Sequence, residues 1–373
     1  MELREFIDRE GRCVIPECVK EIEENAFEAC TELTSIKMHP GVIYIGRKAF
    51  KGCTALTEID IPAGVTEIGV SAFEGCAGLV SAVIPDGVRR IRDAAFRGCT
   101  GLKSIKISES VEEIGASAFE ECTGLTSVDI PDGVTWIDWR SFCHCTGLKS
   151  VRIPSRVTFI GKLAFADCVA LSSVEIPEGV TEICDGAFYG CQKLSSVHIP
   201  GSVTEIGKYA FENCSGLLSV EIPAGVVKVG ERTFSGCKAL SSVRLPDSVT
   251  EISGCAFMGC SGLKSIIIPR GVTRIVGSAF ADCTSLSSIE LPDGLTEIAS
   301  DTFSGCSSLE SIKIPRGVTE IGWGAFEGCT SLSSVELPDS LTKIGLDAFK
   351  GCPGVKDSDV PDCGREEFSD LPF

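Results

Sequence analysis

Phenylalanine recurs through this chain at a fixed interval of 23 residues, from Phe27 to Phe349, with no insertion or deletion. A cysteine stands three residues after each phenylalanine, and a leucine six residues after it, with Val355 closing the leucine series. The unit reads I-P-x-G-V-T-x-I-G-x-x-A-F-x-G-C-x-x-L-x-S-V-x and occurs fifteen times. A short fixed period of this kind is the signature of a solenoid.

Within one unit, the alternation of apolar and polar residues predicts two short extended segments. Val128 and Ile130 alternate with Ser127 and Asp129, as in a half-buried strand. The proline that follows cannot donate to a continuing ladder, and the next glycine favours a turn. A second extended segment follows, as at 65–68. The spacing of Phe, Cys and Leu by three residues then predicts a tight helical or 3₁₀ turn.

A coil of 23 residues has no second layer, so it cannot bury its own apolar side chains, whereas stacked coils cover one another. We therefore predict a solenoid of about 15 right-handed, β-rich coils with a parallel sheet and short helical or 3₁₀ turns. Residues 1–11 are expected to cap the first coil, 12–360 to form the solenoid, and 361–373 to form a cap or tail.

The repeated motif L-x-x-I/V-x-I/L-P-x-x-V-x-x-I-G-x-x-A-F-x-x-C resembles the BspA-like leucine-rich repeat over residues 12–360. The resemblance implies a leucine-rich-repeat fold. It also implies either an extracellular adhesin or an intracellular interaction scaffold, and it brings no catalytic residues with it.

Charge and hydropathy narrow the classes of partner. The 373 residues carry a formal net charge of −18, which argues against general affinity for nucleic acid or anionic membrane. No run approaches 18 apolar residues, so membrane insertion is not expected. The charged amino-terminal stretch does not resemble a secretion signal. We expect a cytoplasmic location for the sequence as written, and an extracellular one if an export signal has been removed.

Fifteen of the 21 cysteines occupy the position after phenylalanine, where we interpret them as small buried hydrophobes. The six others are expected to be the more reactive thiols: Cys13, Cys18, Cys143, Cys184, Cys255 and Cys363. The fragment Cys143-His144-Cys145 resembles part of a metal site, but no second cluster supplies further ligands.

Catalysis by a Ser/His or Cys/His pair is not expected, because the three histidines lie in different coils at different positions of the unit. The chain has no phosphate-binding loop and no G-x-S-x-G elbow. We predict a protein that is not an enzyme and needs neither a cofactor nor a metal.

Departures from the repeat indicate where a partner would bind, since they are not needed for stacking. They are densest at 136–163, where aromatic and basic side chains replace smaller or acidic ones, a composition typical of binding hot spots. An alternative is that Trp136 and Phe159 only shield each other across one rung. The candidate contact residues are Trp136, Trp139, Arg140, His144, Arg152, Arg156 and Phe159.

The leading functional hypothesis is a scaffold that binds a protein partner of unknown identity. A second is a cell-surface adhesin that recognises host matrix or glycans. A third is a passive structural or consensus-like array with no specific ligand, suggested by the absence of any insertion or deletion.

Overall fold

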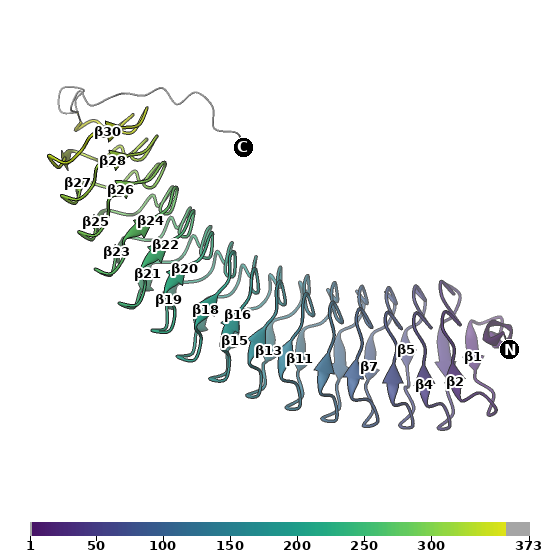
Figure 1. The fold of residues 1–373 in the computed structure, drawn as a ribbon. Coiled ribbons are helices and arrows are strands. Elements are labelled where there is room, and N and C mark those ends of the chain that lie inside the picture. The colour runs from purple at the N-terminus through teal and green to yellow at the C-terminus, as the bar shows by residue number, and fades with distance from the viewer. Residues whose placement is uncertain (1, 356–373) are drawn as a thin grey trace. The chain divides into compact units, whose positions relative to one another are not determined.

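The structure, a computed structural model, describes residues 2–355. It divides into two compact units, residues 1–194 and 195–373, each of which stacks coil upon coil (Figure 1). Every coil contributes one strand to each of two series of parallel sheets, the odd-numbered and the even-numbered strands. The predicted parallel-sheet solenoid is thereby confirmed, and the expected number of about 15 coils is close.

In the first unit, most odd strands begin with serine, and all even strands end in isoleucine. The odd strands are β1 (Arg12–Val14), β3 (Ser35–Lys37), β5 (Glu58–Ile59), β7 (Ser81–Val83), β9 (Ser104–Lys106), β11 (Ser127–Asp129), β13 (Ser150–Arg152) and β15 (Ser173–Glu175). The even strands are β2 (Glu21–Ile22), β4 (Tyr44–Ile45), β6 (Glu67–Ile68), β8 (Arg90–Ile91), β10 (Glu113–Ile114), β12 (Trp136–Ile137), β14 (Phe159–Ile160) and β16 (Glu182–Ile183).

The second unit repeats this arrangement. Its odd strands are β17 (Ser196–His198), β19 (Ser219–Glu221), β21 (Ser242–Arg244), β23 (Ser265–Ile267), β25 (Ser288–Glu290), β27 (Ser311–Lys313) and β29 (Ser334–Glu336). Its even strands are β18 (Glu205–Ile206), β20 (Lys228–Val229), β22 (Glu251–Ile252), β24 (Arg274–Ile275), β26 (Glu297–Ile298), β28 (Glu320–Ile321) and β30 (Lys343–Ile344).

Strand register follows the repeat. Each residue faces the one 23 positions later, as in the pairs Ile36↔Ile59 and Ile22↔Ile45. In both series one residue of a strand points into the coil and is buried while its neighbour points outward. The register therefore stacks identical or similar side chains on one another in the interior, whereas the outward-facing positions of successive coils can vary.

The expected helical or 3₁₀ turn around phenylalanine is wrong. In the coil of Phe50, the backbone N–H groups of Ala49, Lys51 and Cys53 donate to carbonyls three residues back, whereas the N–H of Phe50 donates to Ala72 O of the next coil at 2.8 Å. Lys48 and its equivalents also have positive φ, which no helix continues through. The three-residue spacing reflects successive β-turns that form a further ladder between coils.

The only helix among residues 2–355 is the 3₁₀ helix η1 (Leu3–Phe6), which precedes the first coil. Leu3 is buried, and the guanidinium of Arg4 donates to the carbonyl oxygens of Ala26 and Glu28. These contacts cover the first coil. The proposed cap boundary at residue 11 stays a prediction, and the boundary at 360 and the tail 361–373 lie outside the described residues.

Stacked phenylalanine rings fill the centre of each unit. From Phe27 to Phe188, successive ring centroids lie 5.1 to 5.6 Å apart and all these rings are fully buried. From Phe211 to Phe349 the centroids lie 5.2 to 5.7 Å apart. Each fully buried ring stabilises the fold by about 2 to 3 kcal/mol before entropy is subtracted.

The repeated cysteines are more than small hydrophobes. The Cys76 thiol donates to Phe50 O of the preceding coil at 3.1 Å, and its equivalents do the same within both units. Phe50 O also accepts the backbone N–H of Cys53 at 3.1 Å. The thiol therefore supplies a second donor to a buried carbonyl, which explains why cysteine, and not alanine, fills this position.

Candidate functional site

The structure distributes the seven candidate residues over three parts of the coil. Trp136 and Phe159 lie on even strands β12 and β14, Arg156 precedes β14, and Arg152 lies on the odd strand β13. Trp139, Arg140 and His144 lie in the turns that follow β12. Residues 136–163 are close together in sequence, but their side chains do not form one contiguous surface patch.

Arg140 is held by a buried carboxylate. Its Nη2 lies 2.8 Å from Oε1 of Glu120, whose side chain is only 2% exposed, and Arg97 Nε lies 3.4 Å from the other oxygen. The Arg140 guanidinium also lies over the Trp139 ring, 5.5 Å from its centroid, in a cation–π contact. Arg140 therefore links the buried Glu120 to the exposed Trp139.

Most of the other basic candidates are also paired with acids from neighbouring coils. Arg152 Nη2 lies 2.8 Å from Asp132 Oδ1, and His144 Nδ1 lies 3.6 Å from Asp167 Oδ2. His144 has a φ of 58°, as glycine does in many other coils at this position. The apparent excess of positive charge between 136 and 163 is thus largely neutralised across coils, which counting along the sequence does not reveal.

Trp136 and Phe159 face each other as Cα partners in adjacent strands, as expected for cross-strand packing. The pairing does not cover Trp136, which remains 39% exposed, and Trp139 is 47% exposed. Each exposed tryptophan brings a large apolar area into water, and tryptophan is enriched among the hot spots of protein interfaces.

Trp136 lines an open groove of about 960 Å³ in the first unit, which lies over β6, β8, β10 and β12 and is bordered beyond Trp136 by Arg156 of the next coil. Arginine and glutamate dominate its walls, and glycines widen its turns. The lining residues are Thr66, Glu67, Gly87, Arg89, Arg90, Arg92, Glu109, Ser110, Glu112, Glu113, Gly133, Thr135, Trp136 and Arg156. We refer to this set as the arginine groove.

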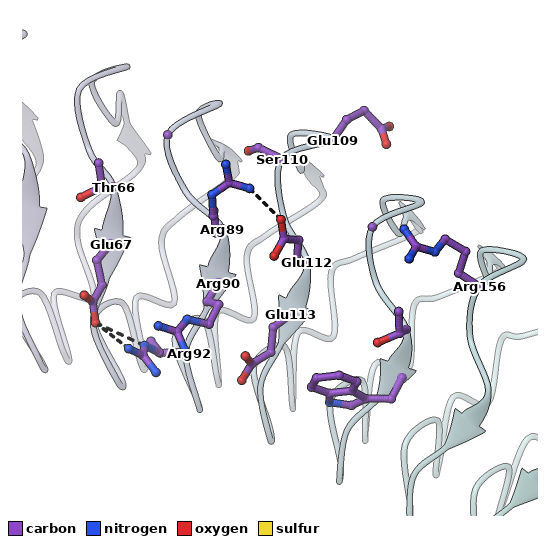
Figure 2. Close-up of a pocket in the computed structure, with 14 residues that line it drawn as sticks. Thr66, Glu67, Arg89, Arg90, Arg92, Glu109, Ser110, Glu112, Glu113 and Arg156 are labelled. Carbon is purple, nitrogen blue, oxygen red and sulfur yellow. Dashed lines mark hydrogen bonds and ion pairs between the residues drawn. The ribbon is translucent and has the colours of Figure 1, made fainter.

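Two ion pairs order the arginine groove (Figure 2). Arg89 Nη1 lies 2.6 Å from Glu112 Oε1, and Arg92 Nη2 lies 3.0 Å from Glu67 Oε1. Arg90 and Arg156 are exposed and have no ion pair among the contacts of residues 2–355. Figure 2 shows the Arg156 side chain extended toward the groove from its turn.

Arg89, Arg90 and Arg92 were not among the candidates from sequence, which were chosen around the aromatic residues that replace smaller or charged repeat residues. The signal was present, since Arg89 replaces the usual threonine and Arg92 the usual glycine of the repeat. Only the fold shows that this cluster and Arg156 share one groove although 66 residues separate Arg90 from Arg156.

The expectation for the cysteines outside the repeated position is partly wrong. Cys13 and Cys143 are 1% and 2% exposed, and burial raises the pKa of both thiols, that of Cys13 to about 11. Cys18 is exposed, and Cys184 and Cys255 are partly exposed. Cys363 lies outside the described residues.

Neither a metal centre nor a membrane-spanning helix emerges from residues 2–355. Nowhere in that range do three or more His, Cys, Asp or Glu side chains gather as a metal site would require. None of its helices has the length and hydropathy needed to cross a bilayer.

The stacked parallel strands and the regular interior define the class of leucine-rich-repeat proteins. More narrowly, the chain belongs to the BspA-type leucine-rich repeat family. The BspA type leucine rich repeat region (6 copies) matches residues 12–125, 66–195, 112–241, 158–284 and 227–356. No match is found among curated proteins.

Solved structures of leucine-rich-repeat proteins are similar to this chain to different degrees. A leucine-rich repeat protein from Bacteroides ovatus is 35% identical over 87% of this chain and 86% of its own, with a TM-score of 0.78. A leucine rich cell surface protein from Faecalibacterium prausnitzii is 29% identical over 94% and 87%, with a TM-score of 0.46. A leucine-rich repeat protein from Eubacterium ventriosum is 18% identical over 97% and 95%, with a TM-score of 0.53.

Proposed function

We propose that this protein is a non-enzymatic scaffold that binds a protein partner through the surface around Trp136 and Trp139. Leucine-rich-repeat solenoids support such a role because they present a long surface whose outward residues vary without disturbing the core. The adhesin and passive-array hypotheses share this architecture and differ in what the surface contacts.

The observation that carries the proposal is the exposure of two tryptophans on one coil, one of which packs against an anchored guanidinium. Trp139 is positioned by Arg140, which is anchored by the buried Glu120. A side chain already fixed in position loses little entropy on binding, and rigid aromatic anchors of this kind dominate interface energetics. Neither tryptophan is needed for stacking, since most other coils hold charged or small residues at these positions.

The proposal is tested by selecting phage-displayed random 12-residue peptides on the immobilised protein. Selected clones are expected to lose at least about tenfold in affinity when Trp136 and Trp139 are both replaced by alanine, because removing a hot-spot side chain costs about 2 kcal/mol or more. Arg140 is left intact, since its replacement would strand the charge of Glu120 and confuse binding with stability.

Trp323 provides the matched control. It occupies the repeat position of Trp139 in the second unit and is 48% exposed. The W323A variant is expected to retain the selected clones. Clones that bind the double variant as well as the wild type would place the site elsewhere, and a selection that enriches nothing would favour the passive array.

A further inference from the structure

The arginine groove has a lining that the repeat does not require. Arg89 and Glu112 stand where most coils have threonine, and Arg92 and Arg156 where most have glycine. Substitutions at outward positions of several coils meet in one hollow, although stacking needs none of them. A groove assembled in this way has the features of a built recognition surface.

The substitutions add positive charge. With Arg90, which stands where most coils have glutamate, the groove holds four arginines against four glutamates, whereas the whole chain has 34 basic and 52 acidic residues. Two of the glutamates, Glu67 and Glu112, are already bound by Arg92 and Arg89. Glu109 accepts the backbone N–H of Asp132. The groove is therefore a local exception on an acidic protein, and a segment with negative charge meets less repulsion here.

Arg90 and Arg156 are the two guanidiniums whose donors face the groove without an ion pair among residues 2–355. A guanidinium offers a planar fork of donors that matches a carboxylate in a bidentate contact. Glu113 lies beside Arg90 as its Cα partner in β10, and its carboxylate is available to accept backbone N–H groups of a bound segment. The lining contains no aliphatic side chain, so Trp136 is its main apolar contact.

The spacing of the two arginines sets the length of the ligand. Three coil steps separate β8, which holds Arg90, from β14, which Arg156 precedes, so the separation along the stack is about 14 Å. An extended polypeptide advances about 3.3 Å per residue, and residues four apart point to the same side. Carboxylates at positions i and i+4 therefore match the separation of the two arginines along the stack. Arg156 is at the repeat position of Gly87, three residues before that of Arg90, so the two long arginine side chains span the remaining offset across the stack, with an apolar residue of the ligand between them close to Trp136.

We propose that the arginine groove binds an extended acidic polypeptide segment, with two carboxylate side chains four residues apart held by Arg90 and Arg156. The inference rests on the proposed function, since it names the chemistry of a protein partner. It explains why the departures at 89–92 and at 156, distant in sequence, occur on the same surface as Trp136.

The test measures fluorescence anisotropy of a labelled peptide with two glutamates four positions apart and a leucine midway, titrated with the full-length protein. We expect saturable binding that weakens as NaCl concentration rises and that falls at least about tenfold in the R90E/R156G variant. Both replacements introduce residues that the repeat itself uses at these positions, so folding should be preserved. Circular dichroism melts verify this.

The variant R274E/R316S changes the charge by the same amount on the second unit and is the matched control, expected to bind as the wild type does. Equal binding of a peptide with lysines in place of the glutamates would overturn the inference. So would equal loss in both double variants, or binding of heparin or oligothymidylate at this groove with no binding of the peptide.

Failure of this inference can be separated from failure of the proposed function. If the glutamate peptide does not bind while phage-selected clones still depend on Trp136 and Trp139, the acidic chemistry is wrong and the scaffold proposal stands. If the peptide binds through Arg90 and Arg156 but the tryptophans contribute nothing to any selected clone, the groove survives and the tryptophan site does not.

Discussion

The interior of the coils and the arginine groove follow opposite rules. Inside, one phenylalanine and one cysteine recur at every coil, each meeting the same atoms of its neighbour. In the groove, arginines, Glu112 and a tryptophan replace repeat residues, and Arg89 and Arg92 form ion pairs with glutamates of neighbouring coils. The interior therefore makes any two neighbouring coils stack, whereas the groove distinguishes one place along the stack from all others.

The sharpest contrast comes from removing one ring of the stack. Phe119 is fully buried between the rings of Phe96 and Phe142, so F119A should lower the free energy of unfolding by about 3 to 5 kcal/mol. Urea denaturation measures this. The control W136A, which removes a larger but exposed ring, should cost under about 1 kcal/mol, and a similar cost for both would contradict the division between interior and surface.

Arg140 tests the division between interior and surface, because it departs from the repeat at an outward position and yet pairs with a buried carboxylate. R140A leaves the buried Glu120 with only Arg97 at 3.4 Å, and should destabilise by about 2 to 3 kcal/mol. R232A is the control, since its partner Glu212 is more exposed, at 12%, and its cost should be smaller. Thermal melts of the two variants that coincide would show that burial of Glu120 adds nothing.

The thiol ladder should show an intermediate effect. C76A removes a buried volume and one donor to Phe50 O, at a cost of about 1 to 2 kcal/mol, whereas C18A should change stability by less than about 0.5 kcal/mol. The order of reactivity toward alkylating reagents should be the opposite, with the exposed thiol reacting before the buried ones. Burial raises the pKa of Cys53 and Cys99 to about 12, so iodoacetamide should label exposed Cys18 first and these thiols only on unfolding, as mass spectrometry can establish.

The smallest effect concerns pH, at two carboxylates of the second unit. The hydrogen bond from Lys228 lowers the pKa of Glu251 below its ordinary 4.5, so the stability it confers is present above that value and lost as pH falls through the folded pKa. Burial raises the pKa of Glu212, so its ionisation costs stability as pH rises. Each effect should be a few tenths of a kcal/mol.

Denaturation at pH 3 and pH 7 separates the two. Relative to wild type, E251Q should be less stable at pH 7 and equal at pH 3, whereas E212Q should gain in relative stability as pH rises. Parallel shifts in both variants would show that general acid expansion, and not these two sites, governs the pH dependence.

Most of the fold was predictable from sequence because each inward residue is repeated at a period that only stacking explains. The turns were not, because spacing by three suits both a 3₁₀ helix and successive β-turns, and only residues with positive φ such as Lys48 distinguish them. Of the site, Trp136 and Trp139 were found as exposed departures. The pairing of Arg140 with Glu120 was hidden, since it joins residues on different coils.

The partners of these contacts between coils also determine which 23-residue repeats the chain could gain or lose. The thiols of Cys145 and Cys168, like those at the same position of neighbouring coils, each donate to the phenylalanine carbonyl 26 residues earlier, so after removal of one whole 23-residue unit the next repeated cysteine would meet an identical carbonyl. Glu120 has no such substitute. Deleting residues 121–143 would bring Leu163 to the place of Arg140 and leave the buried carboxylate facing a hydrocarbon. Duplication and loss of repeats should therefore be tolerated along much of the array but resisted where a buried charge ties two particular coils together.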